Sequence, residues 1–143
     1  LKVYGKIFKL FFDNEFKASK KFKYTYAIEN ATAMGKDQYM NSHCHLPSSF
    51  SCVHYLKINE NNSGITFKNP DNISETMKWV LPKSYDILNK IDSDNSYFFP
   101  TFNLIPKEDT MLIFPSTLHH AVERQINNKN LRISVATNIT LNE

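Results

Sequence analysis

The stretch MLIFPSTLHHAVERQINNKNLRISVATNITL, residues 111–141, contains three candidate strands separated by turn residues. Met111 to Phe114 is fully apolar, as expected of a buried strand, and a Pro-Ser pair ends it. His119 to Gln125 is the second candidate, and an Asn-rich turn at 127–130 leads into a long final strand from Leu131 to Leu141. Short strands joined by turn residues indicate an all-β domain.

Segments earlier in the chain have the same character and predict further strands. They are Lys23–Glu29, Ser51–Ile58, Ile65–Phe67 and Tyr97–Leu104. The stretch 71–96 is polar and irregular, with a short helix expected near Tyr85 to Lys90. Strands at spacings of roughly 10 to 15 residues are typical of a sandwich, barrel or jelly roll, so we expect an all-β fold with minor α-structure.

Length and composition favour one domain over residues 1–143. Residues 1–23 are expected to form an N-terminal arm or edge element, as either a helix or an edge strand. The net charge is only +3, and the lysines between 17 and 23 indicate a solvated face, so we expect no nucleic-acid partner. We also expect no membrane partner, because no run approaches the roughly 18 apolar residues of a span. Cys44 and Cys52 are too few for a disulfide framework, and we interpret them as reduced thiols of a cytoplasmic protein.

Three of the five histidines point to a metal site. His43 and His45 are two residues apart, so on a strand their side chains would point the same way. His119 and His120 are adjacent and would point to opposite faces, so only one of them can join the first pair. Imidazole suits Fe, Zn, Cu and Ni, although this pattern alone leaves surface or core histidines as the alternative.

A carboxylate-binding pair follows on the final strand. Arg132 and Ser134 would share one face of it. A guanidinium holds a carboxylate through two parallel hydrogen bonds, and a hydroxyl can add a third. The alternative is a surface arginine, but Arg132 lies in the most strand-like segment of the chain.

These motifs together resemble the 2-oxoglutarate/Fe(II) oxygenases of the prolyl-hydroxylase-like group, over roughly residues 38 to 140. The first matching signature runs His43-Cys44-His45, Ser51-Cys52-Val53-His54-Tyr55-Leu56 and Gly64-Ile65-Thr66-Phe67-Lys68-Asn69-Pro70. The second and more specific signature runs Phe114-Pro115-Ser116-Thr117-Leu118-His119-His120-Ala121-Val122 and Arg132-Ile133-Ser134-Val135-Ala136-Thr137-Asn138.

The resemblance implies a double-stranded β-helix (a cupin-like jelly roll) that uses Fe(II) and the co-substrate 2-oxoglutarate. It implies that the metal ligands are His43, His45 and His120, with His119 a neighbour. It implies that Arg132 and Ser134 pair with the far carboxylate of 2-oxoglutarate, with Tyr55 as a further candidate donor. The expected apolar lining is Phe67, Phe114, Val122 and Val135. The expected reaction is hydroxylation of a protein residue such as proline, or of a small molecule, with release of succinate.

The sequence departs from the family pattern at Cys52, where Gly is usual, at His54, where Tyr is usual, and at His45. Most members of the wider superfamily have a carboxylate at the last of these positions. We favour a three-histidine site, while Asp37 reaching in or weakened metal binding stays open. A three-histidine cupin-type enzyme without 2-oxoglutarate, a non-catalytic jelly-roll module and a phage structural protein remain alternatives, and a homodimer stays open.

Overall fold

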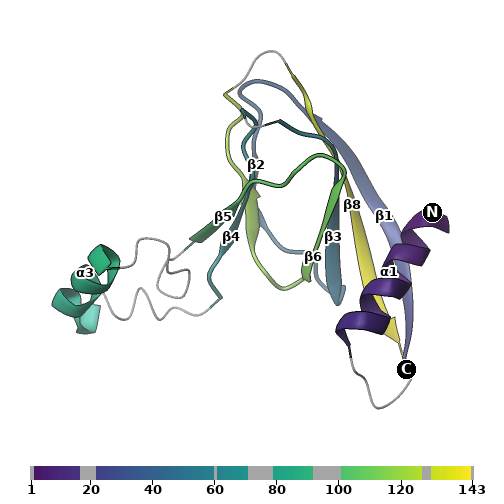
Figure 1. Ribbon diagram of the computed structural model, residues 1–143, viewed down its shortest axis with the longest axis horizontal. Helices are drawn as coiled ribbons and strands as arrows, with labels where there is room; N and C mark the ends of the chain where they lie inside the picture. Colours follow the sequence, from purple (N-terminus) through teal and green to yellow (C-terminus); the bar gives the residue numbers. More distant parts are fainter. Residues whose placement is uncertain are drawn as a thin grey trace.

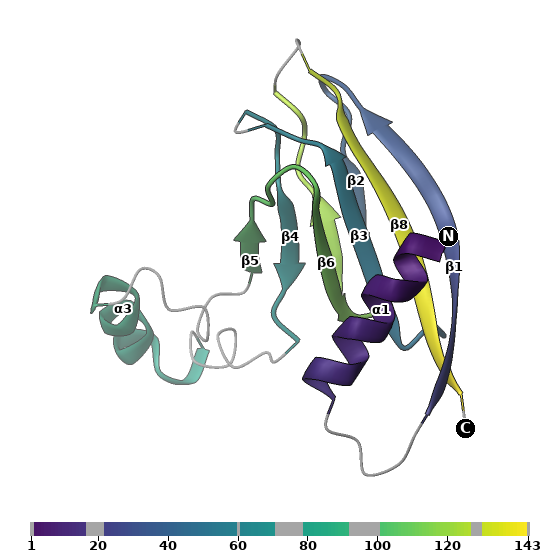
Figure 2. The same cartoon turned by 45° about the vertical axis from the view of Figure 1, so that its right-hand side comes forward.

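The computed structural model describes residues 2–16, 22–59, 61–70, 79–91, 101–126 and 130–142. Within these residues the chain forms two four-stranded sheets in which every neighbouring pair of strands is antiparallel (Figures 1 and 2). The two sheets form a jelly roll, which confirms the predicted fold class.

The first sheet has the strand order β1-β8-β3-β6. Its strands are β1 (Lys23–Met34), β8 (Arg132–Asn142), β3 (Phe50–Lys57) and β6 (Thr110–Pro115). The central strand β8 alternates between faces, as a strand must. Arg132, Ser134 and Ala136 line a cavity between the sheets, while Ile139 belongs to the core on the other face.

The second sheet has the strand order β2-β7-β4-β5. Its strands are β2 (Met40–His43), β7 (His120–Val122), β4 (Ile65–Lys68) and β5 (Thr101–Leu104). These strands are short, and they close the other side of the cavity with Met40, Ile65 and Val122. The cavity therefore lies between the two sheets, where a jelly roll can hold a ligand.

Helix α1 (Lys2–Glu15) packs on the outer face of the first sheet (Figure 2). Phe8 and Phe12 lie one turn apart on one face of the helix and are both buried, in a cluster with Cys52 and Ile139. Full burial of each Phe side chain contributes about 1.5 to 3 kcal/mol. Of the two alternatives expected for the N-terminal segment, the structure therefore has the helix, which covers the sheet.

The observed bounds differ from the sequence prediction in several places. Strand β1 continues to Met34, five residues beyond the predicted end, and β7 is only three residues long. The helix expected near residues 85–90 is α3 (Pro82–Ile91), while 71–78 and 92–100 lie outside the described residues. Among the described helices, none is long and apolar enough to cross a membrane.

Candidate metal centre

His43 and His45 converge with the distant His120 at the cavity. One nitrogen from each of His43, His45 and His120 lies within 4.8 Å of the corresponding nitrogens of the other two. The ring centroids are 4.4 Å apart for His43 and His120, 4.9 Å for His43 and His45, and 5.2 Å for His45 and His120. The structure thus brings together the three histidines that the sequence selected.

Backbone pairing places two of these histidines and a turn places the third. His43 ends β2 and His120 begins β7, and the two are direct cross-strand partners. His45 lies beyond the end of β2, so His43 and His45 do not share a strand as predicted. Instead, the His45 backbone N–H donates to the carbonyl oxygen of Ser116 at 2.9 Å, which fixes the turn against the end of β6.

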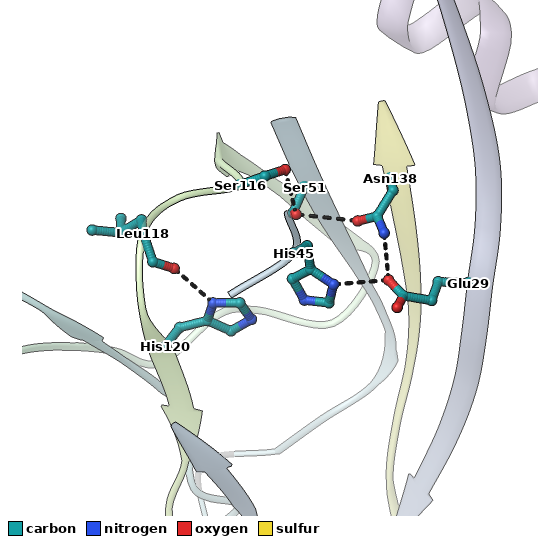
Figure 3. Close-up of polar contacts among 7 residues, drawn as sticks. All are labelled: Glu29, His45, Ser51, Ser116, Leu118, His120 and Asn138. Atoms are coloured by element: carbon teal, nitrogen blue, oxygen red, sulfur yellow. Dashed lines mark hydrogen bonds and ion pairs between the residues drawn. The ribbon is translucent and has the colours of Figure 1, made fainter. Parts of the chain in front are cut away.

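Each of the three imidazoles has an oxygen acceptor next to its Nδ1 atom. The acceptors are the Asn41 carbonyl for His43 at 2.8 Å, the Leu118 carbonyl for His120 at 3.0 Å, and the Glu29 carboxylate for His45 at 2.8 Å (the last two in Figure 3). An oxygen acceptor requires the proton on Nδ1, and in the neutral ring this leaves the lone pair on Nε2. In their neutral forms the three rings therefore offer three Nε2 atoms to one cation, and such outer contacts are typical of metal-binding histidines.

His120 is the most deeply buried of the three. Its relative exposure is 4%, and its ring packs edge-on against Phe114 at a centroid distance of 4.9 Å. The pKa of His120 is lowered to about 4, chiefly by burial and to a smaller extent by the neighbouring histidines, while the hydrogen bond to Leu118 acts in the opposite direction. The ring is therefore neutral near pH 7, as a metal ligand must be.

His119 and Asp37, the other two residues that the sequence offered as possible ligands, lie outside the histidine cluster. His119 is exposed, and its carbonyl accepts from the Lys68 backbone N–H at 2.8 Å. Asp37 lies in the turn after β1, where its φ of 65° and its N–H bond to the Gln125 carbonyl place it outside the ligand group. Asp37 therefore does not replace the missing carboxylate in this structure.

Arg132 lies in the same cavity and is almost completely buried, with a relative exposure of 2%. Its Nη1 donates to the Ser134 hydroxyl at 3.1 Å and lies 3.6 Å from the Met34 sulfur, while its guanidinium carbon lies 5.0 Å from the centre of the Tyr55 ring. Thr32 contacts the Ser134 hydroxyl at 3.1 Å from the other side. No ion pair with a carboxylate is formed by Arg132 in the described part of the chain, which is costly for a buried charge.

Two buried polar side-chain atoms among the described residues have no hydrogen-bond partner, and they belong to Arg132 and Tyr55. They are the Arg132 Nε and the Tyr55 hydroxyl oxygen. Burial raises the pKa of Tyr55 to about 12, against a smaller lowering effect of Arg132, so the hydroxyl keeps its proton. Buried donors are normally satisfied, so this pair points to an absent acceptor.

Arg132 and the three histidines line the same cavity, and Tyr55 lies next to Arg132. Arg132 lines this cavity from β8, and Asn138, six residues further along the same strand, is linked to His45 through Glu29. Between them the inner face carries the small side chains of Ser134 and Ala136. A ligand could therefore contact the histidines and the guanidinium at the same time.

Comparison with known proteins identifies the family. Residues 31–138 match the family model described as "Putative 2OG-Fe(II) oxygenase", where 2OG is 2-oxoglutarate. The chain belongs to this family. No match was found among curated proteins.

Two solved structures share the fold of this 2OG-Fe(II) oxygenase family member. An oxidoreductase of the 2OG-Fe(II) oxygenase family from Burkholderia pseudomallei has a TM-score of 0.59 at 15% identity, covering 92% of this chain and 50% of its own. A prolyl-4-hydroxylase from Pseudomonas putida has a TM-score of 0.52 at 12% identity, covering 96% and 61% respectively. The chain thus spans about half to three fifths of the length of these two proteins.

The residues present fit both groups that the family name implies. Three neutral nitrogen donors suit Fe(II), and the unpartnered donors of Arg132 and Tyr55 suit a carboxylate. Ser134 already accepts from Arg132, so it fixes the guanidinium as well as offering a hydroxyl. Nothing in the donor set conflicts with a metal and a dicarboxylate bound side by side.

Sequence reasoning missed some residues of the site and misplaced one. Val135 lies between two cavity-lining residues of β8 and so points to the opposite face, whereas Val53 lines the cavity in its place. Thr32 and Glu29 were not selected, because Thr32 lies beyond the predicted end of the first strand and Glu29 was its terminal residue. In the sequence, Glu29 could have been noticed as the one acidic residue on the strand face that also carries Thr25 and Ala27.

Proposed function

We propose that this protein is an Fe(II)- and 2-oxoglutarate-dependent hydroxylase. In this proposal His43, His45 and His120 hold the metal, and Arg132 anchors the far carboxylate of 2-oxoglutarate. The reaction joins substrate, dioxygen and 2-oxoglutarate to give hydroxylated substrate, succinate and carbon dioxide. Family membership supports the reaction class, and the geometry of the cavity supports the assignment of the residues.

One observation carries the co-substrate assignment. A guanidinium that is 2% exposed has no carboxylate partner in the described part of the chain and an unused Nε donor, next to an unused Tyr55 hydroxyl. A carboxylate placed there would receive hydrogen bonds from charged and neutral donors together. The opposite end of a five-carbon diacid would then point along the inner face of β8 toward the histidines.

The remaining side chains have supporting roles in this proposal. When bound, Fe(II) supplies the activation of dioxygen, which no side chain of this chain provides. Phe114 packs against both Phe67 and His120 at centroid distances of 4.9 Å, so these rings exclude water from one side of the centre. Val53 and Val122 add apolar lining within the cavity.

The substrate is proposed only as a class. A protein residue such as proline is supported by the shared fold with the prolyl-4-hydroxylase, and a small molecule is the alternative. The test is a two-by-two binding experiment without oxygen, in which the melting temperature is measured with Fe(II), with 2-oxoglutarate, with both and with neither. We expect the largest increase with both ligands, because bound ligands stabilise the folded state by mass action.

Succinate release then tests turnover. Metal-loaded protein is incubated with oxygen and 2-oxoglutarate, with and without proline-containing peptides, and succinate is measured. Protein that binds Fe(II) but shows no added stabilisation by 2-oxoglutarate and forms no succinate would contradict the proposal. That result would favour the one alternative that the all-histidine set supports, a cupin-type enzyme that does not use 2-oxoglutarate.

A further inference from the structure

Glu29 forms a direct contact with one of the three clustered histidines. Its Oε2 atom lies 2.8 Å from the His45 Nδ1 (Figure 3). The other two histidines donate to backbone carbonyls, so within the described residues Glu29 is the one carboxylate that contacts this group. The His45 side chain is 9% exposed and that of Glu29 is 43% exposed, so the contact lies at the rim of the cavity.

A β-bulge directs the Glu29 side chain inward. In the pairing of β1 with β8, Ile28 is opposite Thr137 and Asn30 is opposite Ala136, so Glu29 is the extra residue. Two consecutive side chains therefore face the interior, since Asn30 lines the cavity while Glu29 reaches His45. Bulges of this kind commonly redirect a side chain next to a functional site.

A closed circuit of hydrogen bonds holds Glu29 in this position, and Figure 3 shows its side-chain links from Ser116 through Ser51, Asn138 and Glu29 to His45. Asn138 Nδ2 donates to Glu29 Oε2 at 2.5 Å, and Asn138 Oδ1 accepts from the Ser51 hydroxyl at 3.2 Å. Ser51 also contacts the Ser116 hydroxyl at 2.8 Å, and the Ser116 carbonyl accepts from the His45 backbone N–H. The circuit thus fixes the ring and the backbone of His45 together.

We infer that Glu29 is a positioning residue for the metal centre, which holds His45 with Nε2 toward the cation and supplies the negative charge that the ligand set lacks. This inference rests on the proposed metal binding by the three histidines. Three neutral imidazoles bring no charge to a divalent cation. A carboxylate that accepts the Nδ1–H makes the imidazole more basic and fixes its tautomer.

The geometry explains why Glu29 acts through His45 and not on the metal. Its Oε2 atom already receives both the His45 Nδ1–H and the Asn138 amide. Nδ1 is not the nitrogen of His45 that is free for the cation, so Glu29 stands behind the ring. The negative charge that a ligating Asp or Glu usually carries therefore lies behind a ligand, on the Glu29 carboxylate that contacts His45.

The test uses Co(II), which is stable in air as a probe and has a visible spectrum that reports its coordination. Its affinity is measured for the parent, Glu29→Gln, Glu29→Ala and Glu15→Gln, the last being a matched loss of charge at the exposed end of α1. We expect roughly a 10- to 100-fold loss for Glu29→Ala, as found for outer partners of metal ligands. Glu29→Gln should lose less, because an amide oxygen still accepts the Nδ1–H, and Glu15→Gln should match the parent.

A second readout separates positioning from simple stabilisation of the fold. Long-range ¹H–¹⁵N NMR of metal-free protein should show His45 protonated on Nδ1 in the parent and in Glu29→Gln, and mixed tautomers in Glu29→Ala. A Glu29→Ala variant that melts at lower temperature yet keeps its Co(II) affinity and tautomer would overturn the inference. An equal loss of affinity in Glu15→Gln would also overturn it.

The double variant tests direct ligation. If His45→Ala keeps Co(II) and only His45→Ala/Glu29→Ala loses it, Glu29 is itself a ligand and the inference is wrong. If His45→Ala alone loses the metal, Glu29 acts through His45. A parent protein that binds no Co(II) would instead remove the proposed function, while the NMR experiment still measures the Glu29–His45 contact by itself.

Discussion

The substitution Arg132→Met should raise the stability of the ligand-free protein while removing 2-oxoglutarate binding. Arg132 is buried without a carboxylate partner in the described chain, and desolvation of such a charge costs several kcal/mol. The substitution loses one charged hydrogen bond to Ser134, about 1.5 to 3 kcal/mol, and the contact with the Tyr55 ring, about 1 kcal/mol. Met fills much of the same volume with a flexible apolar chain.

The expected net gain is about 1 kcal/mol in the free energy of unfolding, or about 3 to 4 °C in melting temperature for a domain of this length. The assay is urea and thermal denaturation after treatment with a chelator. In the metal-loaded protein the same variant should bind 2-oxoglutarate at least about 100-fold more weakly, because two charged hydrogen bonds are worth about 3 kcal/mol or more. Calorimetric titration measures this loss.

Arg124→Met is the matched control, because Arg124 is the other arginine of the sequence and is exposed. Arg124→Met should change neither the free energy of unfolding nor the affinity for 2-oxoglutarate. Arg132→Lys keeps the charge but not the two-pronged contact, so it should weaken 2-oxoglutarate by about 1.5 to 3 kcal/mol and metal by less. A ligand-free Arg132→Met protein that is less stable than the parent would refute the argument from burial, and unchanged 2-oxoglutarate affinity would refute the anchor.

Three further outcomes follow from the histidines. His119→Ala should keep metal affinity and His120→Ala should lose it, as measured by metal analysis of dialysed protein, and the reverse result would exchange their roles. His45→Asp should keep or tighten Fe(II) binding, because it restores the commoner carboxylate ligand, and this is measured by titration without oxygen. The folded-state pKa of His120 is lowered to about 4 while the unfolded chain binds the proton near 6.5, so the metal-free protein should lose stability as pH falls from about 6.5 to 4. This loss of stability is at most about 3 kcal/mol. A His120→Gln variant should lose correspondingly less stability over the same pH range. Equal profiles of stability against pH in the parent and the variant would contradict the effect of burial on His120.

Several features of this site could be predicted from the sequence because they depend on local pattern. The alternation expected of any strand is enough to assign Arg132 and Ser134 to one face of β8, and the structure joins them by a hydrogen bond. The same rule separated His119 from His120, and one is exposed while the other is buried. Spacing alone could not show that His43 and His120 meet, and for this the resemblance to a known family was needed.

Other features were decided only by tertiary structure, because they depend on which strands pair and in what register. The bulge at Glu29 arises from the pairing of β1 with β8, whose partners are separated by roughly a hundred residues. His45 belongs to the cluster as expected but for a different reason, since a contact with Ser116 rather than a shared strand orients it. The assignment of Val135 to the cavity was a different kind of error, because alternation along β8 already places Val135 on the face opposite Arg132 and Ser134. The sequence thus determined the chemistry available to this chain, while long-range pairing determined which carboxylate stands behind the histidines.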